Sequence, residues 1–179
     1  MTPATPAIEF TSVPAWAVAP RRAEADLSGR YWTVLAFLDG DGQPGAATEI
    51  ATDWVAQIQA HHPGATPRVH LVSDDAAAQD AVDEDMSTAL VGWRLMVAGP
   101  ADACLRLRAH AVGNAIGDDE IVVGSTDVAH RDVHCAHCRV VTCATVELAG
   151  GIRCRGCGRN LAVQSHVSRR IGAHLGVMT

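Results

Sequence analysis

Two Cys-x-x-Cys pairs near the C-terminus constrain the fold of this chain more than any other feature. They are Cys135–Cys138 and Cys154–Cys157, and fifteen residues that include Gly150-Gly151 separate them. Each pair can place two thiolates on one tight turn, and a hairpin between the pairs would bring four sulfurs into the tetrahedron that Zn²⁺ prefers. Gly158 after the last cysteine lets the backbone fold beneath the metal. The spacing therefore predicts a closed zinc site with Cys135, Cys138, Cys154 and Cys157 as ligands.

Two disulfides are the alternative for these four cysteines, and they would need an oxidising compartment. No basic residue precedes Arg21, and the N-terminal residues contain no apolar run of signal-peptide length. No stretch is as long and apolar as a membrane span requires. We therefore expect a cytoplasmic protein whose thiols stay reduced. Cys104 and Cys143 lie outside the pattern, and we expect both to be small buried hydrophobes.

The charge is distributed unevenly along the chain. Residues 1–130 contain 18 acids and 7 arginines, a net charge of −11, whereas residues 131–179 contain 7 arginines and 2 acids, a net charge of +5. The planar guanidinium group favours interface carboxylates and phosphates, so a partner surface is at least as good an interpretation as a solvated face. We single out Arg169 and Arg170 as candidate docking residues.

Residues 29–130 alternate between strand and helix patterns, after a Pro- and Ala-rich arm over residues 1–28. Apolar runs and β-branched residues predict strands at 31–38, 68–72, 93–98 and 121–123. Four-residue apolar spacing, caps and Pro positions predict helices at 46–62, 74–85 and 101–112. This order is typical of a parallel sheet with right-handed crossovers, and the fold class is therefore α/β with a Rossmann-like domain.

Residues Leu95–Pro100, the helix after them and Asp118–Val123 resemble the end of the nucleotide-binding module of ferredoxin reductases. In that family the strand ends in Cys-Gly-Pro, and here Ala98 replaces the cysteine. The first strand leads into Asp39-Gly-Asp-Gly42 instead of a Gly-x-Gly-x-x-Gly loop, and acids there would repel a pyrophosphate. The resemblance implies the fold of that module, and the two departures argue against retained nicotinamide binding.

Residues 131–179 have the pattern of a small β zinc ribbon with a C-terminal tail. Val140–Leu148 is β-branched, Gly150-Gly151 suits a hairpin turn, and Leu161–His166 can add a third strand. Such a unit is too small to fold on core burial alone, so the metal would supply much of its stability. With four thiolates present, we interpret His134, His137 and His166 as neighbours of the site and not as ligands.

The C-terminal region also resembles a known family. The segments that carry the resemblance are His134–Cys138, Cys154–Leu161, His166–Arg170 and Gly172–Val177. Over about the last 45 residues they are similar to the A subunit of bacterial dimethylamine monooxygenase. The resemblance implies a subunit of a heteromeric complex that uses NADPH and O₂ to demethylate dimethylamine to methylamine and formaldehyde. It also implies flavin and an iron–sulfur cluster on a reductase partner, and haem on an oxygenase partner.

The residues of this chain agree with an accessory role. The sequence has no haem attachment motif, no plant-type spacing for [2Fe–2S], and no residue that stands out as a catalytic nucleophile or base. We therefore predict no catalytic residue on this chain and leave cofactor-binding residues other than the metal ligands open. Two alternatives are a rubredoxin-like electron carrier with iron in the Cys₄ site, and a zinc-ribbon module that binds nucleic acid. The net acidity and the absence of lysine argue against nucleic acid as a partner.

Overall fold

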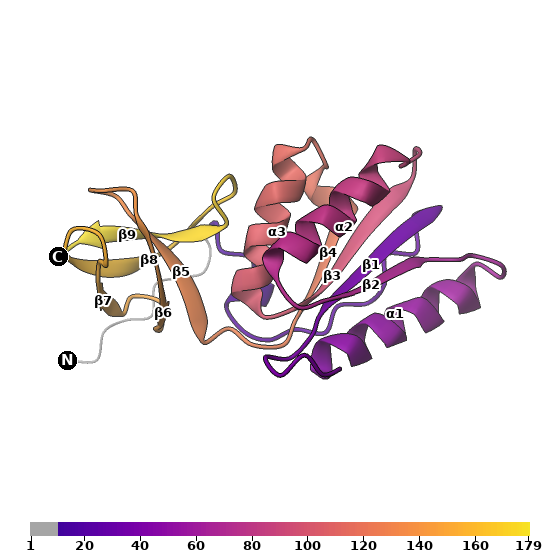
Figure 1. Ribbon diagram of the computed structural model, residues 1–179, viewed down its shortest axis with the longest axis horizontal. Coiled ribbons are helices and arrows are strands. Elements are labelled where there is room, and N and C mark those ends of the chain that lie inside the picture. Colours follow the sequence, from indigo (N-terminus) through magenta and orange to yellow (C-terminus); the bar gives the residue numbers. More distant parts are fainter. Residues whose placement is uncertain (1–10) are drawn as a thin grey trace.

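The computed structural model describes residues 11–179 and shows two β-sheets side by side along the long axis of the molecule (Figure 1). We call residues 31–125 the α/β unit and residues 130–179 the C-terminal β unit. The first ten residues of the predicted N-terminal arm lie outside the described residues. No helix within residues 11–179 combines the length and the apolar character that crossing a membrane requires.

The α/β unit contains a four-stranded parallel sheet, as predicted. Its strands are β1 (Tyr31–Phe37), β2 (Arg68–Val72), β3 (Trp93–Gly99) and β4 (Ile121–Ser125), in the order β2-β1-β3-β4. Its helices are α1 (Ala46–His61), α2 (Asp75–Ser87) and α3 (Ala101–Gly113), followed by the short helix η3 (Asp118–Glu120). The order of strands and helices and their bounds agree with the sequence pattern to within two residues at nearly every end, because apolar spacing and caps act locally.

Helices cover both faces of this sheet. Alternate side chains of each strand point to opposite faces, so Val34 and Met96 pack against α1, whereas Leu35 and Val97 pack toward α2 and α3. The four side chains are at most 1% exposed. The central strands β1 and β3 are therefore buried on both faces, which explains their continuous apolar runs.

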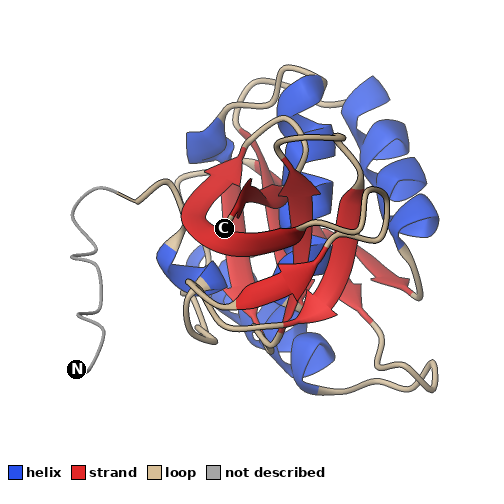
Figure 2. Cartoon of the chain, turned by 90° about the vertical axis from the view of Figure 1, so that its left-hand side faces the viewer, coloured by secondary structure: helices blue, strands red, loops and turns tan. Residues whose placement is uncertain are grey.

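The C-terminal β unit forms a five-stranded sheet that curls in front of the α/β unit in Figure 2. Its order is β6-β5-β9-β8-β7. The strands are β5 (His130–Cys135), β6 (Val141–Thr145), β7 (Gly151–Arg153), β8 (Asn160–Ser168) and β9 (Ala173–Met178). Two of them were not predicted. The segment expected to be a C-terminal tail is β9, which lies between β8 and β5 and pairs parallel with β5.

The predicted hairpin at Gly150-Gly151 is wrong. The hairpins are β5–β6 and β7–β8, and their turns are the two Cys-x-x-Cys segments themselves. We call Cys135–Cys138 the first Cys turn and Cys154–Cys157 the second. Strands β6 and β7, which flank Gly150, lie at opposite edges of the sheet. Each Cys-x-x-Cys segment already supplies the tight turn of a hairpin. The residues between the two pairs instead connect β6 at one edge of the sheet to β7 at the other.

Residues 11–21 join the two sheets. The short helix η2 (Ala15–Ala17) packs with Val13 in an apolar cluster that also contains Ala101 and Leu105 of α3 and Val167 of β8. The Ser125 hydroxyl donates a hydrogen bond to the Trp16 carbonyl at 2.6 Å. This part of the predicted arm thus lies on its own chain, in the seam between the units.

Charged side chains reinforce the same seam. Arg106 of α3 contacts Asp132 of β5 at 2.6 Å and Asp75 at the start of α2, also at 2.6 Å. Arg131 is 3% exposed, and its guanidinium donates hydrogen bonds to the carbonyls of Ala17 (3.0 Å) and Val146 (2.9 Å). Burial lowers the pKa of Arg131, against the opposing effect of nearby carboxylates. The Arg106 ion pair joins the C-terminal β unit to α3, and the Arg131 bond to Ala17 joins it to η2.

Candidate metal centre

The two Cys turns share one backbone conformation. In the first, the N–H of Cys135 donates to the carbonyl of Val140 at 3.0 Å, and the N–H of Arg139 donates to the carbonyl of Cys135 at 2.9 Å. In the second, the N–H groups of Cys154 and Gly158 make the equivalent bonds, both at 2.9 Å. The residue after each second cysteine is left-handed, with φ of 64° at Arg139 and 70° at Gly158. Glycine adopts this conformation without strain, as the sequence predicted, whereas Arg139 adopts it against its usual preference.

The turns bring all four predicted cysteines together. Their Sγ atoms lie within 4.8 Å of one another; Cys138 and Cys154 are 3.5 Å apart, and Cys135 and Cys157 are 3.9 Å apart. A tetrahedron with Zn–S bonds of about 2.3 Å has edges of about 3.8 Å, so the cluster has the size of a Cys₄ metal site. All four are free thiols at separations too long for disulfides. The donor set fits a metal and does not fit the disulfide alternative.

Backbone N–H groups polarise the sulfur of Cys154. The N–H of Cys157 lowers the pKa of Cys154 to about 6, and the N–H of Gly156, 3.4 Å from the same sulfur, adds to this effect against burial. A thiolate is the form that binds a metal, so a thiol that ionises near neutral pH favours metal capture.

Gly156 allows the two turns to approach each other, a role that the sequence reasoning missed. A Cβ at this position would lie 2.7 Å from Val140 Cγ2 and 3.1 Å from Cys138 Sγ. Any larger residue at Gly156 would therefore push the second Cys turn away from the first. The presence of glycine inside a Cys-x-x-Cys segment was the sequence signal for this close approach.

The histidines near the cysteines in sequence are not part of the sulfur cluster. His137 is exposed, His134 is half-buried, and His166 is exposed with Nδ1 2.9 Å from the Ser12 hydroxyl. His174, which the sequence reasoning did not single out, is 1% exposed on β9. Burial, with help from Arg131, lowers the pKa of His174 to about 4, so it is neutral.

The other two cysteines differ from each other. Cys104 is fully buried on α3, as expected, and burial raises the pKa of its thiol. Cys143 is exposed on β6, so the expectation of a buried side chain is wrong. It lies opposite Asp132 of β5, and β6 is an edge strand of the sheet. Partial burial and then Asp132 raise the pKa of Cys143, which disfavours the reactive thiolate.

The surface around the Cys turns is cationic. Arg139, Arg153, Arg155 and Arg159 are all exposed, and none forms an ion pair with a carboxylate in the part of the chain that the structure describes. By contrast, Arg22, Arg68, Arg94, Arg106 and Arg108 of the first 130 residues each pair with an acid. The basic excess predicted from the sequence is therefore free to meet a partner.

The two candidate docking arginines lie in the turn between β8 and β9, away from the Cys turns. Arg169 contacts Asp118 of η3 at 3.1 Å, with 68% of its side chain exposed. Arg170 is exposed. The turn is pressed onto α3: Gly172 has φ of 69°, and a Cβ there would lie 2.5 Å from the carbonyl oxygen of Leu105.

The chain covers the edge of the parallel sheet at which open α/β sheets in general bind their ligands. The carboxyl end of β3 leads into α3, whose first N–H, that of Ala101, donates to the carbonyl of Asp127 at 2.8 Å. At the start of α1, the Asp39 carboxylate lies so close to Gly45 that a Cβ there would overlap it. A carboxylate thus occupies the helix N-terminus where a phosphate would bind.

Comparisons with known proteins agree with the C-terminal pattern. Residues 132–177 match the family model described as "Dimethylamine monooxygenase subunit DmmA-like, C-terminal domain". The chain is 38% identical over 114 residues to the "Heme-dependent oxidative N-demethylase delta subunit" of Ectopseudomonas mendocina (strain ymp).

That alignment covers 60% of this chain and 63% of the relative, so the chain spans less than two thirds of the relative's length. No similar solved structure was found. The matched segment contains all four clustered cysteines. The predicted resemblance to the A subunit of dimethylamine monooxygenase is therefore confirmed, with the family model covering residues 132–177.

Proposed function

We propose that this chain is an accessory subunit of a heteromeric, NADPH- and O₂-dependent dimethylamine monooxygenase. Such a complex carries out oxidative N-demethylation of dimethylamine to methylamine and formaldehyde. The observation that carries the proposal is that the segment matching the family also builds the four-sulfur cluster. The delta subunit of an oxidative N-demethylase, a single component of such an enzyme by its name, is similar to this chain.

The metal of the proposed site is zinc, and its role is structural. Cys135, Cys138, Cys154 and Cys157 would hold it, and the two Cys turns supply all four ligands. A closed Cys₄ site has no open position for water or substrate, so it supports folding and not a reaction. The apolar cluster beneath it is small, with Val133, Leu161 and Val163 fully buried, which agrees with a need for metal stabilisation.

The reactive cofactors would lie on other subunits. Haem belongs to the proposed oxygenase subunit, and flavin, an iron–sulfur cluster and the NADPH site belong to the proposed reductase subunit. We interpret the α/β unit of this chain as a Rossmann-like module, related in form to the nucleotide module of ferredoxin reductases, that serves assembly. The covered sheet edge and the Asp39 carboxylate support this interpretation. We propose a cytoplasmic complex.

The cationic C-terminal β unit supports a docking role. Its exposed arginines, including Arg170, are available to partner carboxylates, and Arg169 remains largely exposed although it contacts Asp118. We propose no nucleic acid and no membrane as partner.

A rubredoxin-like electron carrier is the second candidate, because a tetrahedral set of four sulfurs suits iron as well as zinc. An iron site would absorb visible light, and a zinc site would not.

Reconstitution tests the proposal. The chain is co-expressed with the other proposed subunits, and the purified assembly is analysed for subunits, metals and NADPH-dependent dimethylamine consumption. We expect co-elution, about one zinc per copy of this chain, and lower turnover when the chain is omitted. A colourless, zinc-loaded chain that never joins the assembly would contradict the subunit role, and stoichiometric iron with a visible spectrum would favour the electron carrier.

A further inference from the structure

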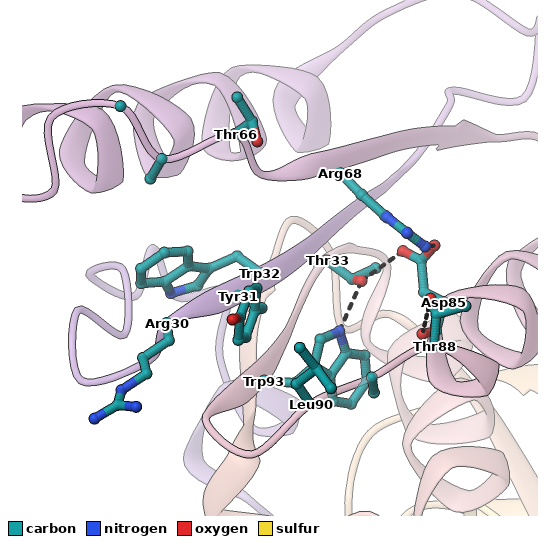
Figure 3. A pocket seen from close by; sticks show the side chains of 13 residues that line it. Arg30, Tyr31, Trp32, Thr33, Thr66, Arg68, Asp85, Thr88, Leu90 and Trp93 are labelled. Carbon is teal, nitrogen blue, oxygen red and sulfur yellow. Dashed lines mark hydrogen bonds and ion pairs between the residues drawn. The ribbon is translucent and has the colours of Figure 1, made fainter.

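A cavity of about 400 Å³ lies at the amino ends of the parallel strands (Figure 3), and this end of the α/β unit is far from the C-terminal β unit (Figure 1). The first residues of β1, β2 and β3 line it, together with the loop before β2 and the end of α2. The seam with the C-terminal β unit lies at the opposite ends of these strands, where β3 leads into α3. The cavity is therefore free of the chain's own second unit.

Among the described residues, the one acid that lines the cavity, Asp85, is hydrogen-bonded within the chain. Asp85 is 3% exposed and accepts hydrogen bonds from Thr33, from Arg68 at 2.7 Å and from His70 at 2.9 Å. Trp93 donates from its indole N–H to the Thr33 hydroxyl at 3.0 Å, and Figure 3 shows this chain of bonds along one wall. The Asp85 carboxylate is thus occupied by its own chain and leaves no unpaired negative charge for a ligand.

The rim of the cavity is apolar and open to water. Tyr31 is 47% exposed, Leu90 is 60% exposed, and the adjacent Val91 is 94% exposed. A small molecule inside the cavity would leave Val91 and much of Leu90 in water. A protein surface would cover both the rim and the hollow, as interfaces with a central pocket do.

In the described part of the chain, the mouth of the cavity also has one unpaired positive charge, on Arg30, beside the paired Arg68. Arg30 is exposed and forms no ion pair within residues 11–179, and the Arg68 side chain is 55% exposed although it contacts Asp85. Figure 3 places Arg30 beside Trp32 and Arg68 beside Asp85. No other carboxylate lines the cavity. Residues 1–130 have a net charge of −11, but this mouth presents an arginine and is therefore complementary to a carboxylate of a partner.

We propose that this cavity is a docking site for a segment of a partner polypeptide. The segment inserts one bulky apolar side chain into the hollow, covers Leu90 and Val91, and places a carboxylate near Arg30 or Arg68. This inference rests on the proposed function, in which the chain works within a heteromeric complex. The α/β unit then meets its partner at this end, and the cationic C-terminal β unit remains available for another.

The test uses the full chain and the other proposed subunits of the N-demethylase. The double variant Leu90→Glu/Val91→Glu puts two charges on the rim, and Thr52→Glu/Gln59→Glu puts the same charge on the exposed face of α1 as a matched control. Binding of each form is measured by analytical ultracentrifugation, with circular dichroism and metal content as checks of folding. We expect the rim variant to bind at least about 10-fold more weakly and the control to stay within about twofold, as for a central anchor.

Two further measurements keep the test decisive. If the rim variant misfolds, the exposed Arg30→Glu variant replaces it, and it should bind about 3-fold to 10-fold more weakly. Hydrogen exchange of the wild-type complex should show protection at residues 30–33 and 88–93. An assembly that takes up the folded rim variant as well as wild type would overturn the docking site and leave the proposed function standing. A wild-type chain that joins no assembly would overturn both.

Discussion

Replacing Arg106 by methionine should weaken the contact between the two units of the chain and lower the free energy of unfolding. The Arg106 side chain is 29% exposed and contacts Asp75, Asp102 and Asp132, on α2, α3 and β5 respectively. Methionine keeps much of the length and the apolar stem and removes the charge. The substitution leaves two largely buried carboxylates without a partner, because the Asp132 and Asp102 side chains are only 11% and 14% exposed.

The magnitude follows from this partial burial. Removing one member of a fully buried ion pair costs about 3–5 kcal/mol, and losing an exposed pair costs about 0–1 kcal/mol. Arg106 lies between these limits and nearer the first, so we expect a loss of roughly 3 kcal/mol in the free energy of unfolding. For a chain of this size, that corresponds to a fall in Tm of roughly 6–12 °C.

Urea and thermal unfolding followed by circular dichroism measure the effect. The matched control is Arg22→Met, because Arg22 contacts Asp53 at 2.9 Å with both side chains more than half exposed; it should lose less than about 1 kcal/mol. Adding Asp132→Asn to Arg106→Met should recover part of the loss, because the unpaired charge is removed. If Arg106→Met loses no more stability than Arg22→Met, the seam does not depend on this network and the reasoning is wrong.

Four further predictions concern the metal, the sheet edge, the docking turn and acid stability. Cys154→Ser should lose zinc by elemental analysis and unfold the C-terminal β unit, because metal binding and folding are coupled; retention of a full complement of zinc would contradict this. The isolated chain should show no saturable NADPH binding by calorimetry at sub-millimolar concentration, because a carboxylate and the chain itself cover the phosphate positions. Replacing Arg169 and Arg170 with alanine should weaken assembly and lower dimethylamine turnover with zinc content unchanged, whereas a purely solvated pair would change neither. The folded-state pKa of His174 of about 4 is below the unfolded value, so the unfolded state binds more protons as pH falls. Stability should therefore decrease by up to roughly 3 kcal/mol from pH 6.5 to pH 4, and His174→Gln should flatten this slope in urea titrations.

The sequence by itself determined the elements whose signals are local. Alternating strand and helix patterns predicted the four parallel strands and three helices of the α/β unit, and Arg68–Val72 has the predicted bounds. The spacing of the two Cys-x-x-Cys pairs predicted the four-sulfur cluster, because two such turns of matched geometry have few other uses. These inferences succeed because helix periodicity, caps and turn chemistry act between residues only a few positions apart.

Only the tertiary structure decided how distant segments meet. The pairing of β9 with β5 joins residues about forty positions apart, and no short-range pattern marks that choice. Arg106 has an ordinary helical position in the sequence, and its role arises because Asp75 and Asp132 reach it from other elements. The apolar rim of Leu90 and Val91 likewise became visible only when the strand ends were placed around a cavity. Non-local contacts depend on the whole fold, since the free energy of each one is realised only after the chain has brought its partners together.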